Sequence, residues 1–149
     1  MTTAKNIMTK DVITVAPDDD IIYAVKILLE KKFNGLPVVE DGIVTGILCQ
    51  SDIIVQQKKL HLPSFFVFFD GIISLGSEKD FKKEVAKITA LKVREIMTKN
   101  PVTVKSDTLI ETIAALIVDN NFHTLPVIDE GVLTGVIGME DILKTMIHV

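Results

Sequence analysis

Two aspartates occupy the same place in two similar stretches of this chain. Asp52 and Asp141 each follow a short apolar segment and open an apolar helical pattern, and a glycine, Gly46 or Gly135, lies six residues before each of them. A glycine inside a strand often marks a close approach of another group to the backbone. The free N–H groups and the positive dipole end of a helix start favour an anion. The pattern therefore predicts a site for an anion or a sugar hydroxyl at each strand-to-helix junction.

The elements that must position these aspartates follow from the apolar pattern. Apolar runs flank Asp41-Gly42 in the first copy and Glu130-Gly131 in the second, which predicts two short strands joined by a tight turn. Upstream, Val12–Val15 is a β-rich run that predicts a further strand. Asp18 is then placed to cap a helix that ends near Phe33. A last helix, from Asp52 to Gln57, completes the order strand, helix, strand, strand, helix.

The second half of the chain repeats the first without a gap. A shift of 89 residues superimposes Ile96-Met97-Thr98-Lys99 on Ile7-Met8-Thr9-Lys10, and Thr103-Val104 on Thr14-Val15. A gapless match through five elements is far more specific than any single motif within it. We therefore expect two small units that share a core, at residues 1–59 and 93–149, with an unmatched segment at 60–92.

Composition narrows the class of protein. The chain has 149 residues, a net charge of −4 and a pI near 5.3, so it offers no basic face for nucleic acid or an acidic membrane. Cys49 is the single cysteine, which excludes an intramolecular disulfide, and the N-terminus does not resemble a signal peptide. The most apolar segment, Leu60–Leu75, is shorter than the roughly 20 residues of a spanning helix. We expect a soluble protein of the cytoplasm.

The unmatched segment is strongly apolar. Leu62–Phe69 holds four of the seven phenylalanines, and such a patch must be covered by something. A domain this small has little spare interior, which favours a self-association surface over a core. Ser77–Asp80 then predicts the start of an amphipathic helix that leads to the second repeat.

The duplicated unit resembles the cystathionine β-synthase (CBS) domain, and two in tandem resemble the pair known as a Bateman module. The resemblance rests on the Ile-Met-Thr segment, the Leu-Pro-Val strand and the glycine-to-aspartate junction, and it covers residues 5–59 and 94–149. It implies an α/β (α+β) fold in which two β-α-β-β-α units pack through their sheets about a pseudo-two-fold axis. It further implies a flat homodimer and two clefts for an adenosine-containing ligand such as AMP, ADP, ATP or S-adenosylmethionine. Such pairs are sensors and not enzymes.

The resemblance also implies a ligand-binding role for particular residues. The junction aspartates, Asp52 in a first cleft and Asp141 in a second, would accept hydrogen bonds from both ribose hydroxyls, which suits a carboxylate. Adenine would lie in an apolar slot near the first strand and the Leu-Pro strand. One slot would consist of Ile13 and Thr14 with Gly35, Leu36 and Pro37, and the other of Val102 and Thr103 with Thr124, Leu125 and Pro126.

The chain departs from the family pattern three residues before each aspartate. The family commonly has Ser or Thr there, whereas this chain has Cys49 and Gly138. Ser51 lies beside Asp52 and could donate to a phosphate, but Glu140 lies beside Asp141 and would repel one. We therefore expect the Asp52 cleft to be the better nucleotide site, and we count His123 as a further candidate phosphate contact.

Ordinary structural roles compete with these assignments. Aspartate is a favoured N-cap without any ligand, and Gly46 and Gly135 could serve a bulge or close packing, although we favour proximity to ligand. Cys49 has no histidine near it in sequence, so we expect it to pack in the interior. The three histidines, His61, His123 and His148, lack metal-ligand spacing, and His123 could be a simple exposed side chain.

Two functions remain open from the sequence. The first is a free-standing regulatory sensor that binds an adenosine derivative between its repeats and signals in trans to an unknown effector protein. The alternative is a homodimeric protein-interaction scaffold with vestigial clefts, which the missing Ser or Thr at Cys49 and Gly138 supports. No acid–base pair, activated nucleophile or P-loop spacing indicates an enzyme, and no cofactor is required.

Overall fold

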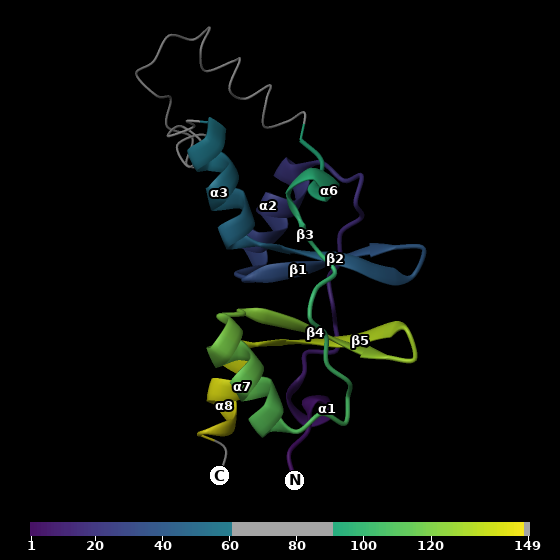
Figure 1. Cartoon of the computed structure of the whole chain (residues 1–149), viewed down its shortest axis with the longest axis vertical. Helices are drawn as coiled ribbons and strands as arrows, with labels where there is room; N and C mark the ends of the chain where they lie inside the picture. Colours follow the sequence, from purple (N-terminus) through teal and green to yellow (C-terminus); the bar gives the residue numbers. More distant parts are fainter. Residues whose placement is uncertain (61–90, 148–149) are drawn as a thin grey trace, which may run out of the picture.

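The computed structural model describes residues 1–60 and 91–147 as two stacked layers (Figure 1). The helices are α1 (Ala4–Ile7), α2 (Ile21–Lys31), α3 (Gln50–Leu60), α6 (Val93–Ile96), α7 (Ile110–Asn120) and α8 (Met139–Thr145). The strands are β1 (Gly35–Glu40), β2 (Ile43–Cys49), β3 (Thr98–Lys99), β4 (Thr124–Asp129) and β5 (Val132–Gly138). The predictions for Leu62–Phe69, the helix after Ser77, His61 and His148 lie outside the described residues. The predicted boundaries at 59/60 and 92/93 stay predictions.

The two hairpins are confirmed. Strands β1 and β2 pair antiparallel, as do β4 and β5. Both residues of each turn have positive φ: 52° and 80° at Asp41 and Gly42, and 50° and 78° at Glu130 and Gly131. Such turns twist in the same sense as the flanking strands. The mixed helix and strand content agrees with the expected α+β fold.

The predicted strand over Val12–Val15 is wrong. Only Val15 pairs there, in an isolated parallel bridge with Val38. Its N–H donates to the Pro37 carbonyl at 3.1 Å, and its carbonyl accepts from Val39 at 2.9 Å. The β-rich composition of this run therefore yields one rung of a ladder, and Val104 forms the same bridge with Val127 in the second repeat.

The helix boundaries also differ from the prediction. Helix α2 begins two residues later than expected, with Asp20 rather than Asp18 at the N-cap, and it ends at Lys31. Lys32 follows in the left-handed conformation with φ of 56°. Helix α3 begins at Gln50, two residues before the predicted start at Asp52. Asp52 is therefore inside the first turn of its helix.

The segment that leads into each repeat packs in the core of the other repeat. We call residues 4–10 and 93–99 the leading segments. The first core consists of Val15, Ile21, Ala24, Val25, Leu28, Leu36, Val38, Leu48 and Ile53 together with Val93 and Ile96. The second consists of Val104, Ile113, Ile117, Leu125, Val127 and Ile137 together with Ala4. Each repeat thus completes its core with residues from the opposite half of the chain.

Backbone pairing fixes this exchange. Strand β3, in the second leading segment, pairs with β2 of the first repeat, and Thr9 exchanges two hydrogen bonds with Val136 of the second, at 2.9 and 3.0 Å. The second leading segment is also held by an Arg94–Asp18 ion pair at 2.7 Å.

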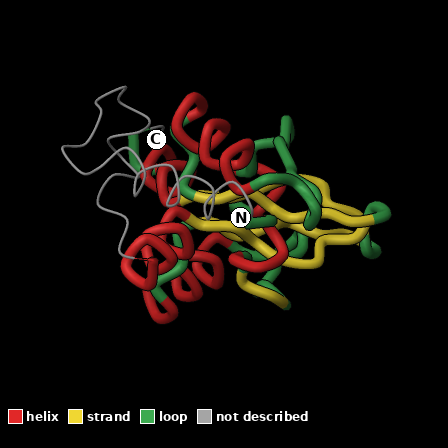
Figure 2. The backbone as a smooth tube through the Cα atoms, turned by 90° about the horizontal axis from the view of Figure 1, so that it is seen from above, coloured by secondary structure: helices red, strands yellow, loops and turns green. Residues whose placement is uncertain are grey.

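The two repeats meet through their sheets. Strand β1 contacts β4, and β2 contacts β5. Helices α2, α3, α7 and α8 gather on one side of the molecule, and the hairpin turns point to the other (Figures 1 and 2). This arrangement brings the open ends of the two hairpins together, which is where the predicted junctions lie.

Candidate functional site

Both junction aspartates bind the backbone of their own helix start. The Cys49 N–H donates to Asp52 Oδ2 at 2.8 Å, and the Gly138 N–H donates to Asp141 Oδ2 at the same distance. When a carboxylate at the third helical position accepts a hydrogen bond from the N-cap N–H, it forms half of a capping box. The expectation that these residues are N-caps is therefore wrong, although their stabilising role is real.

The two junctions differ at the other carboxylate oxygen. Asp52 Oδ1 accepts a hydrogen bond at 3.1 Å from Thr98 Oγ1, in the second leading segment. No hydrogen bond joins Thr9, the counterpart of Thr98, to Asp141 within residues 1–60 and 91–147. In the same part of the chain Asp141 Oδ1 has no partner, so it is available to a ligand.

Two clefts lie between the repeats, one beside each junction. Cleft A, beside Asp141, has a volume of about 230 Å³, and cleft B, beside Asp52, has one of about 340 Å³. Ligand pockets usually measure roughly 300–1,000 Å³. Each cleft is thus near the lower limit for a ligand of nucleoside size.

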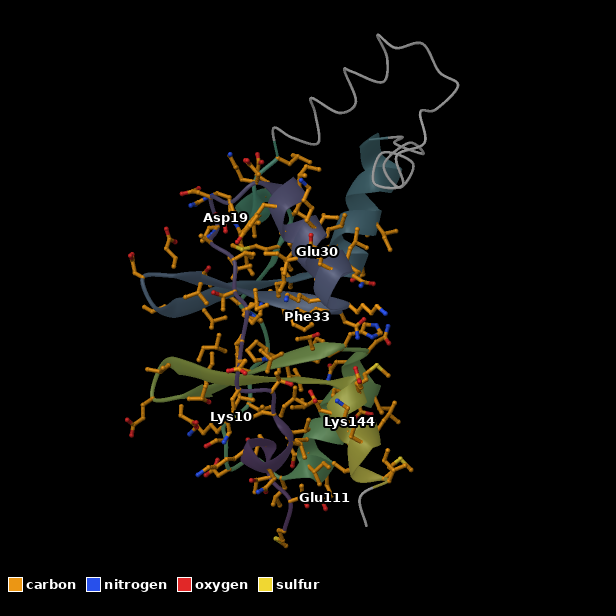
Figure 3. All side chains as sticks on the ribbon, turned by 180° about the vertical axis from the view of Figure 1, so that it is seen from behind. Lys10, Asp19, Glu30, Phe33, Glu111 and Lys144 are labelled. Carbon is orange, nitrogen blue, oxygen red and sulfur yellow. The ribbon has the colours of Figure 1, made fainter. Side chains whose placement is uncertain are left out.

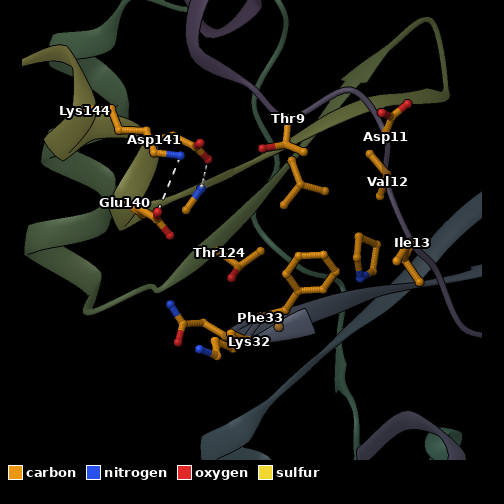
Figure 4. Close-up of a pocket in the computed structure, with 15 residues that line it drawn as sticks. Thr9, Asp11, Val12, Ile13, Lys32, Phe33, Thr124, Glu140, Asp141 and Lys144 are labelled. Atoms are coloured by element: carbon orange, nitrogen blue, oxygen red, sulfur yellow. Dashed lines mark hydrogen bonds and ion pairs between the residues drawn. The ribbon is translucent and has the colours of Figure 1, made fainter. Parts of the chain in front are cut away.

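Cleft A draws its walls from both repeats (Figure 4). The first repeat contributes Thr9, Asp11, Val12, Ile13, Lys32, Phe33, Asn34, Gly35 and Pro37, and the second contributes Thr124, Val136, Gly138, Glu140, Asp141 and Lys144. The apolar side chains of Ile13 and Phe33 lie across the cavity from the Asp141 carboxylate.

Cleft B is the counterpart of cleft A, with the repeats exchanged. The first repeat contributes Ile47, Cys49, Ser51 and Asp52, the second leading segment contributes Thr98, and the second repeat contributes Asn100, Pro101, Val102, Asn121, Phe122, His123, Thr124 and Leu125. An apolar wall again faces a carboxylate.

The structure shows which apolar slot lies with which carboxylate, a pairing that the sequence left open. Ile13, Gly35 and Pro37 share a cleft with Asp141, whereas Val102 and Leu125 share one with Asp52. The reason is the contact of β1 with β4 and of β2 with β5, which turns the open end of each hairpin toward the other repeat. Each cleft therefore combines the apolar slot of one repeat with the aspartate of the other.

Most of the predicted residues line a cleft, but six do not. The residues outside both clefts are Thr14, Leu36, Gly46, Thr103, Pro126 and Gly135. Leu36 and Pro126 are buried in the interior, and Thr14 and Thr103 are exposed elsewhere.

The two strand glycines serve packing and not the clefts. A Cβ on Gly46 would lie 2.7 Å from Met97 Sδ, and one on Gly135 would lie 2.5 Å from Met8 Sδ. Their proximity to ligand, which we favoured, is therefore not supported, and the alternative of close packing is.

Cleft A carries more charge than cleft B. Lys32 and Lys144 supply cations at its rim, and Lys144 Nζ lies 3.4 Å from Glu140 Oε1. Phe33 and Lys144, from different repeats, lie on the same side of the molecule on either side of the boundary (Figure 3). Because Glu140 is paired, its repulsion of a phosphate is weaker than the sequence suggests.

Cys49, in the wall of cleft B, is a poor nucleophile. Burial, and secondarily the nearby Asp52 carboxylate, raise the pKa of its thiol from 9.0 to about 11. A thiol with such a pKa is almost wholly protonated at neutral pH. Within the described residues, no group of three His, Cys, Asp or Glu side chains could hold a metal ion.

Sequence reasoning missed several cleft residues. Phe33 and Phe122 are equivalent in the repeat, as are Thr9 and Thr98, and their identity in both copies was the available signal. Lys144 follows Asp141 by one helical turn, a spacing that brings two side chains to the same face.

The comparisons with known proteins agree with this geometry. The family model of the CBS domain matches twice, at residues 4–58 and 93–148. The chain therefore belongs to the CBS domain family, and it carries the domain as a tandem pair.

Relatives cover nearly the whole chain. Protein MJ1426 of Methanocaldococcus jannaschii is 31% identical, with 96% of this chain and 90% of the relative aligned. Two further relatives are longer: the chain spans 44% of the length of protein MJ1225 of Methanocaldococcus jannaschii and 58% of that of the chloroplastic protein CBSX2 of Arabidopsis thaliana. No helix among the described residues is both long enough and apolar enough to cross a membrane.

Two solved structures of CBS pairs are similar and contain ligands. CBSX2 of Arabidopsis thaliana in complex with AMP has a TM-score of 0.73 and 25% identity, over 98% of this chain and 96% of that one. The CBS pair of protein MJ0100, in complex with 5′-methylthioadenosine and S-adenosyl-L-methionine, has a TM-score of 0.70 and 26% identity, over 99% and 97%.

Proposed function

We propose that this CBS pair is a regulatory module that binds an adenosine-containing ligand between its repeats. The observation that carries the proposal is cleft A, where an apolar wall faces a carboxylate that has one oxygen without a partner among residues 1–60 and 91–147. A carboxylate accepts from two vicinal hydroxyls, and the apolar wall suits a purine. The two solved neighbours bind AMP in one case, and 5′-methylthioadenosine and S-adenosyl-L-methionine in the other. All three ligands contain an adenosine portion.

Cleft A is the primary nucleotide site. Within the described residues its carboxylate keeps an oxygen free, and Lys32 lines the same cleft, where its cation would attract a phosphate. In cleft B both oxygens of Asp52 are already used, by Cys49 and Thr98. This assignment reverses the preference for the Asp52 cleft that Ser51 suggested.

The ligand acts by shifting the relative orientation of the repeats. A molecule that contacts both walls of a cleft binds best to one separation of the two sheets, so it stabilises that separation. The exchanged leading segments transmit the change, because Thr9 lines cleft A while its backbone is paired with Val136. The output passes in trans to an effector protein, and the module has no catalytic role.

The partner in assembly is a second copy of the chain. Exposed apolar side chains occur on four helices that gather on one side of the molecule (Figure 1). They are Leu29 on α2, Ile54 and Val55 on α3, Val118 on α7, and Leu143 on α8. A group of exposed apolar side chains on neighbouring helices is typical of an interface. Light scattering coupled to size-exclusion chromatography should give twice the chain mass of 16.4 kDa, and a monomer at micromolar concentration would contradict this.

The test of ligand binding is a thermal-shift series with AMP, ATP and S-adenosylmethionine. A ligand that binds the folded state raises the Tm. Asp141→Ala should lose most of the rise given by AMP, and the matched variant Asp52→Ala should keep most of it. Each rise is measured against the same variant without ligand, because either substitution also removes a capping hydrogen bond.

A second variant separates binding from capping. Asp141→Asn retains an oxygen for the Gly138 N–H but loses the carboxylate that would accept from both ribose hydroxyls. It should fold like the wild type and still lose the ligand-dependent rise. No rise with any of the three ligands, together with no retained small molecule in native mass spectrometry, would favour the interaction scaffold.

A further inference from the structure

The two clefts differ in charge although the sequence repeats. The shift of 89 residues pairs each charged residue that lines cleft A, apart from Asp141, with an uncharged residue of the other copy. The pairs are Asp11 with Asn100, Lys32 with Asn121, Glu140 with Ser51, and Lys144 with Val55. Three of the uncharged residues, Asn100, Asn121 and Ser51, line cleft B. The repeat thus keeps the aspartate of each cleft and changes the other charges.

The wall of cleft B is almost neutral. Within the described residues it contains no lysine or arginine. Because burial raises the pKa of the Cys49 thiol to about 11, that thiol is uncharged at neutral pH. His123 is the one side chain of this wall that would become a cation on protonation. A phosphate in cleft B would therefore meet the Asp52 carboxylate with no lysine or arginine in the described wall to offset the repulsion.

Lys32 lies at a position where the backbone favours a different residue. It follows α2 in the left-handed conformation, with φ of 56°, and Asn121 follows α7 with the same φ. Asparagine adopts this conformation more readily than lysine does, so the end of the helix does not explain the lysine of the first repeat. Its side chain lines cleft A, and Figure 4 shows it far from Asp11, across the cleft.

Cleft B nevertheless offers groups that suit a nucleoside. Thr98 donates its proton to Asp52 Oδ1, so the lone pairs of the threonine oxygen are left to accept from a ribose hydroxyl. A ligand with no charge at its 5′ end loses little on entering an apolar wall, whereas a phosphate loses its hydration. The apolar wall consists of Ile47, Pro101, Val102, Phe122 and Leu125.

We propose that the two clefts select adenosine derivatives by the charge of the 5′ substituent. Cleft A takes a nucleotide, whose phosphate is attracted by Lys32, and cleft B takes a nucleoside without a phosphate. This proposal rests on the proposed binding of an adenosine derivative between the repeats, and it adds which derivative each cleft prefers. Each of the two ligands then has a site of its own, so the module responds to two small molecules.

The experiment is calorimetric titration of the full chain with AMP and with 5′-methylthioadenosine. The two probes share the adenosine portion, and only AMP carries a phosphate. Asp52→Asn leaves cleft A as the intact site, and Asp141→Asn leaves cleft B. Cleft A should bind AMP about threefold or more tightly than 5′-methylthioadenosine, and cleft B should show the opposite order. The same order in both variants, or no binding of 5′-methylthioadenosine by Asp141→Asn, overturns the proposal.

An exchange of Lys32 and Asn121 tests whether the charge causes the selectivity. Lys32→Asn, combined with Asp52→Asn, should lower the affinity for AMP about threefold and leave that for 5′-methylthioadenosine unchanged. Thermal unfolding without ligand should show no loss of stability, because asparagine suits the left-handed conformation. Asn121→Lys, combined with Asp141→Asn, should raise the affinity of cleft B for AMP by a similar factor. Added salt should weaken the binding of AMP to cleft A and not that of 5′-methylthioadenosine.

His123→Asn is the control for the remaining cation. It copies Asn34, the equivalent residue of cleft A, and cleft B should keep its preference for 5′-methylthioadenosine. A loss of that preference contradicts the proposal. Binding of AMP to cleft A that neither Lys32→Asn nor salt weakens also contradicts it, while leaving ligand binding intact. Absence of binding of both probes by the wild type contradicts the proposed function itself.

Discussion

Met97 packs directly on the backbone of Gly46, so that a Cβ at Gly46 would lie 2.7 Å from the Met97 sulfur. Met8 has the same relation to Gly135 in the other repeat. Each glycine thus lets a leading segment approach the central strand of the opposite repeat. The contact joins two parts of the chain that are far apart in sequence, and it is repeated under the pseudo-two-fold axis.

Alanine at Gly46 should destabilise the protein. The added methyl group would also lie 2.8 Å from the Thr98 carbonyl oxygen. This carbonyl cannot move without disturbing the pairing of β3 with β2. Overpacking of this kind costs roughly 1–3 kcal/mol, and Gly135→Ala should cost a similar amount. Chemical denaturation measures the loss.

Gly138→Ala is the matched control for these substitutions. Its Cβ would meet nothing closer than 3.6 Å, and Cys49 occupies the equivalent position in the first repeat. Because Gly138 is the N-cap of α8, where alanine is less favourable than glycine, we expect a small loss of stability that stays below that of Gly46→Ala. An equal loss in Gly138→Ala and Gly46→Ala would contradict the packing explanation.

Val93→Ala should weaken the first repeat although it lies in the second half of the sequence. Val93 is fully buried in the core of the first repeat, and deleting two buried methyl groups should cost about 1–3 kcal/mol. Val132→Ala, at a position 59% exposed on β5, is the control and should change the stability less. Because the cores exchange residues, unfolding should remain one transition. Separate transitions of the two repeats would argue against the exchange.

The hairpins and their carboxylate junctions could be predicted because their signals are local. Asp41-Gly42 and Glu130-Gly131 encode tight turns through residues that accept positive φ. The short strand over Val12–Val15 could not be predicted correctly, because its β-rich composition does not reveal that only Val15 finds a backbone partner. That partner, Val38, lies in β1, further along the sequence.

The duplication alone could not predict which leading segment packs against which repeat. Because Met8 and Met97 are equivalent in the repeat, we expect them to have similar surroundings. The sequence does not indicate which repeat each methionine packs against. For the same reason the sequence did not indicate which aspartate shares a cleft with Ile13, and in the structure it is Asp141. A duplicated sequence is compatible with each leading segment packing on its own repeat or on the other repeat. Packing between the sheets determines which of the two arrangements forms.

Cys49 should react slowly with thiol reagents. Because burial raises its pKa from 9.0 to about 11, the thiolate fraction at pH 8 is about a hundredfold smaller than that of an ordinary cysteine. Alkylation by iodoacetamide, followed by mass spectrometry at pH 7 to 10, measures the rate. Asp52→Asn removes the second cause of the raised pKa and should speed the reaction. A rate equal to that of a free cysteine at pH 8 would contradict the buried environment.

Asp129 should contribute stability that is lost in acid. Its Oδ1 accepts hydrogen bonds at 3.0 Å from the backbone N–H and the hydroxyl of Ser106, and Thr134 donates to its Oδ2 at 3.1 Å. The backbone hydrogen bond from Ser106 is the largest cause that lowers the pKa of this carboxyl below 3.8. These bonds tie the turn before α7 to the end of β4.

The sign of the pH dependence follows from the lowered pKa. A carboxyl whose pKa is lower in the folded state stabilises that state at pH values above the unfolded pKa, and the stabilisation disappears as the pH falls through the folded pKa. The Tm of the wild type should therefore exceed that of Asp129→Asn at pH 7, and the difference should shrink below about pH 3.8. Ser106→Ala, which keeps the backbone donor, should show a smaller difference of the same sign. A gap between wild type and Asp129→Asn that stays constant from pH 7 to pH 3 would mean that the carboxylate charge contributes nothing.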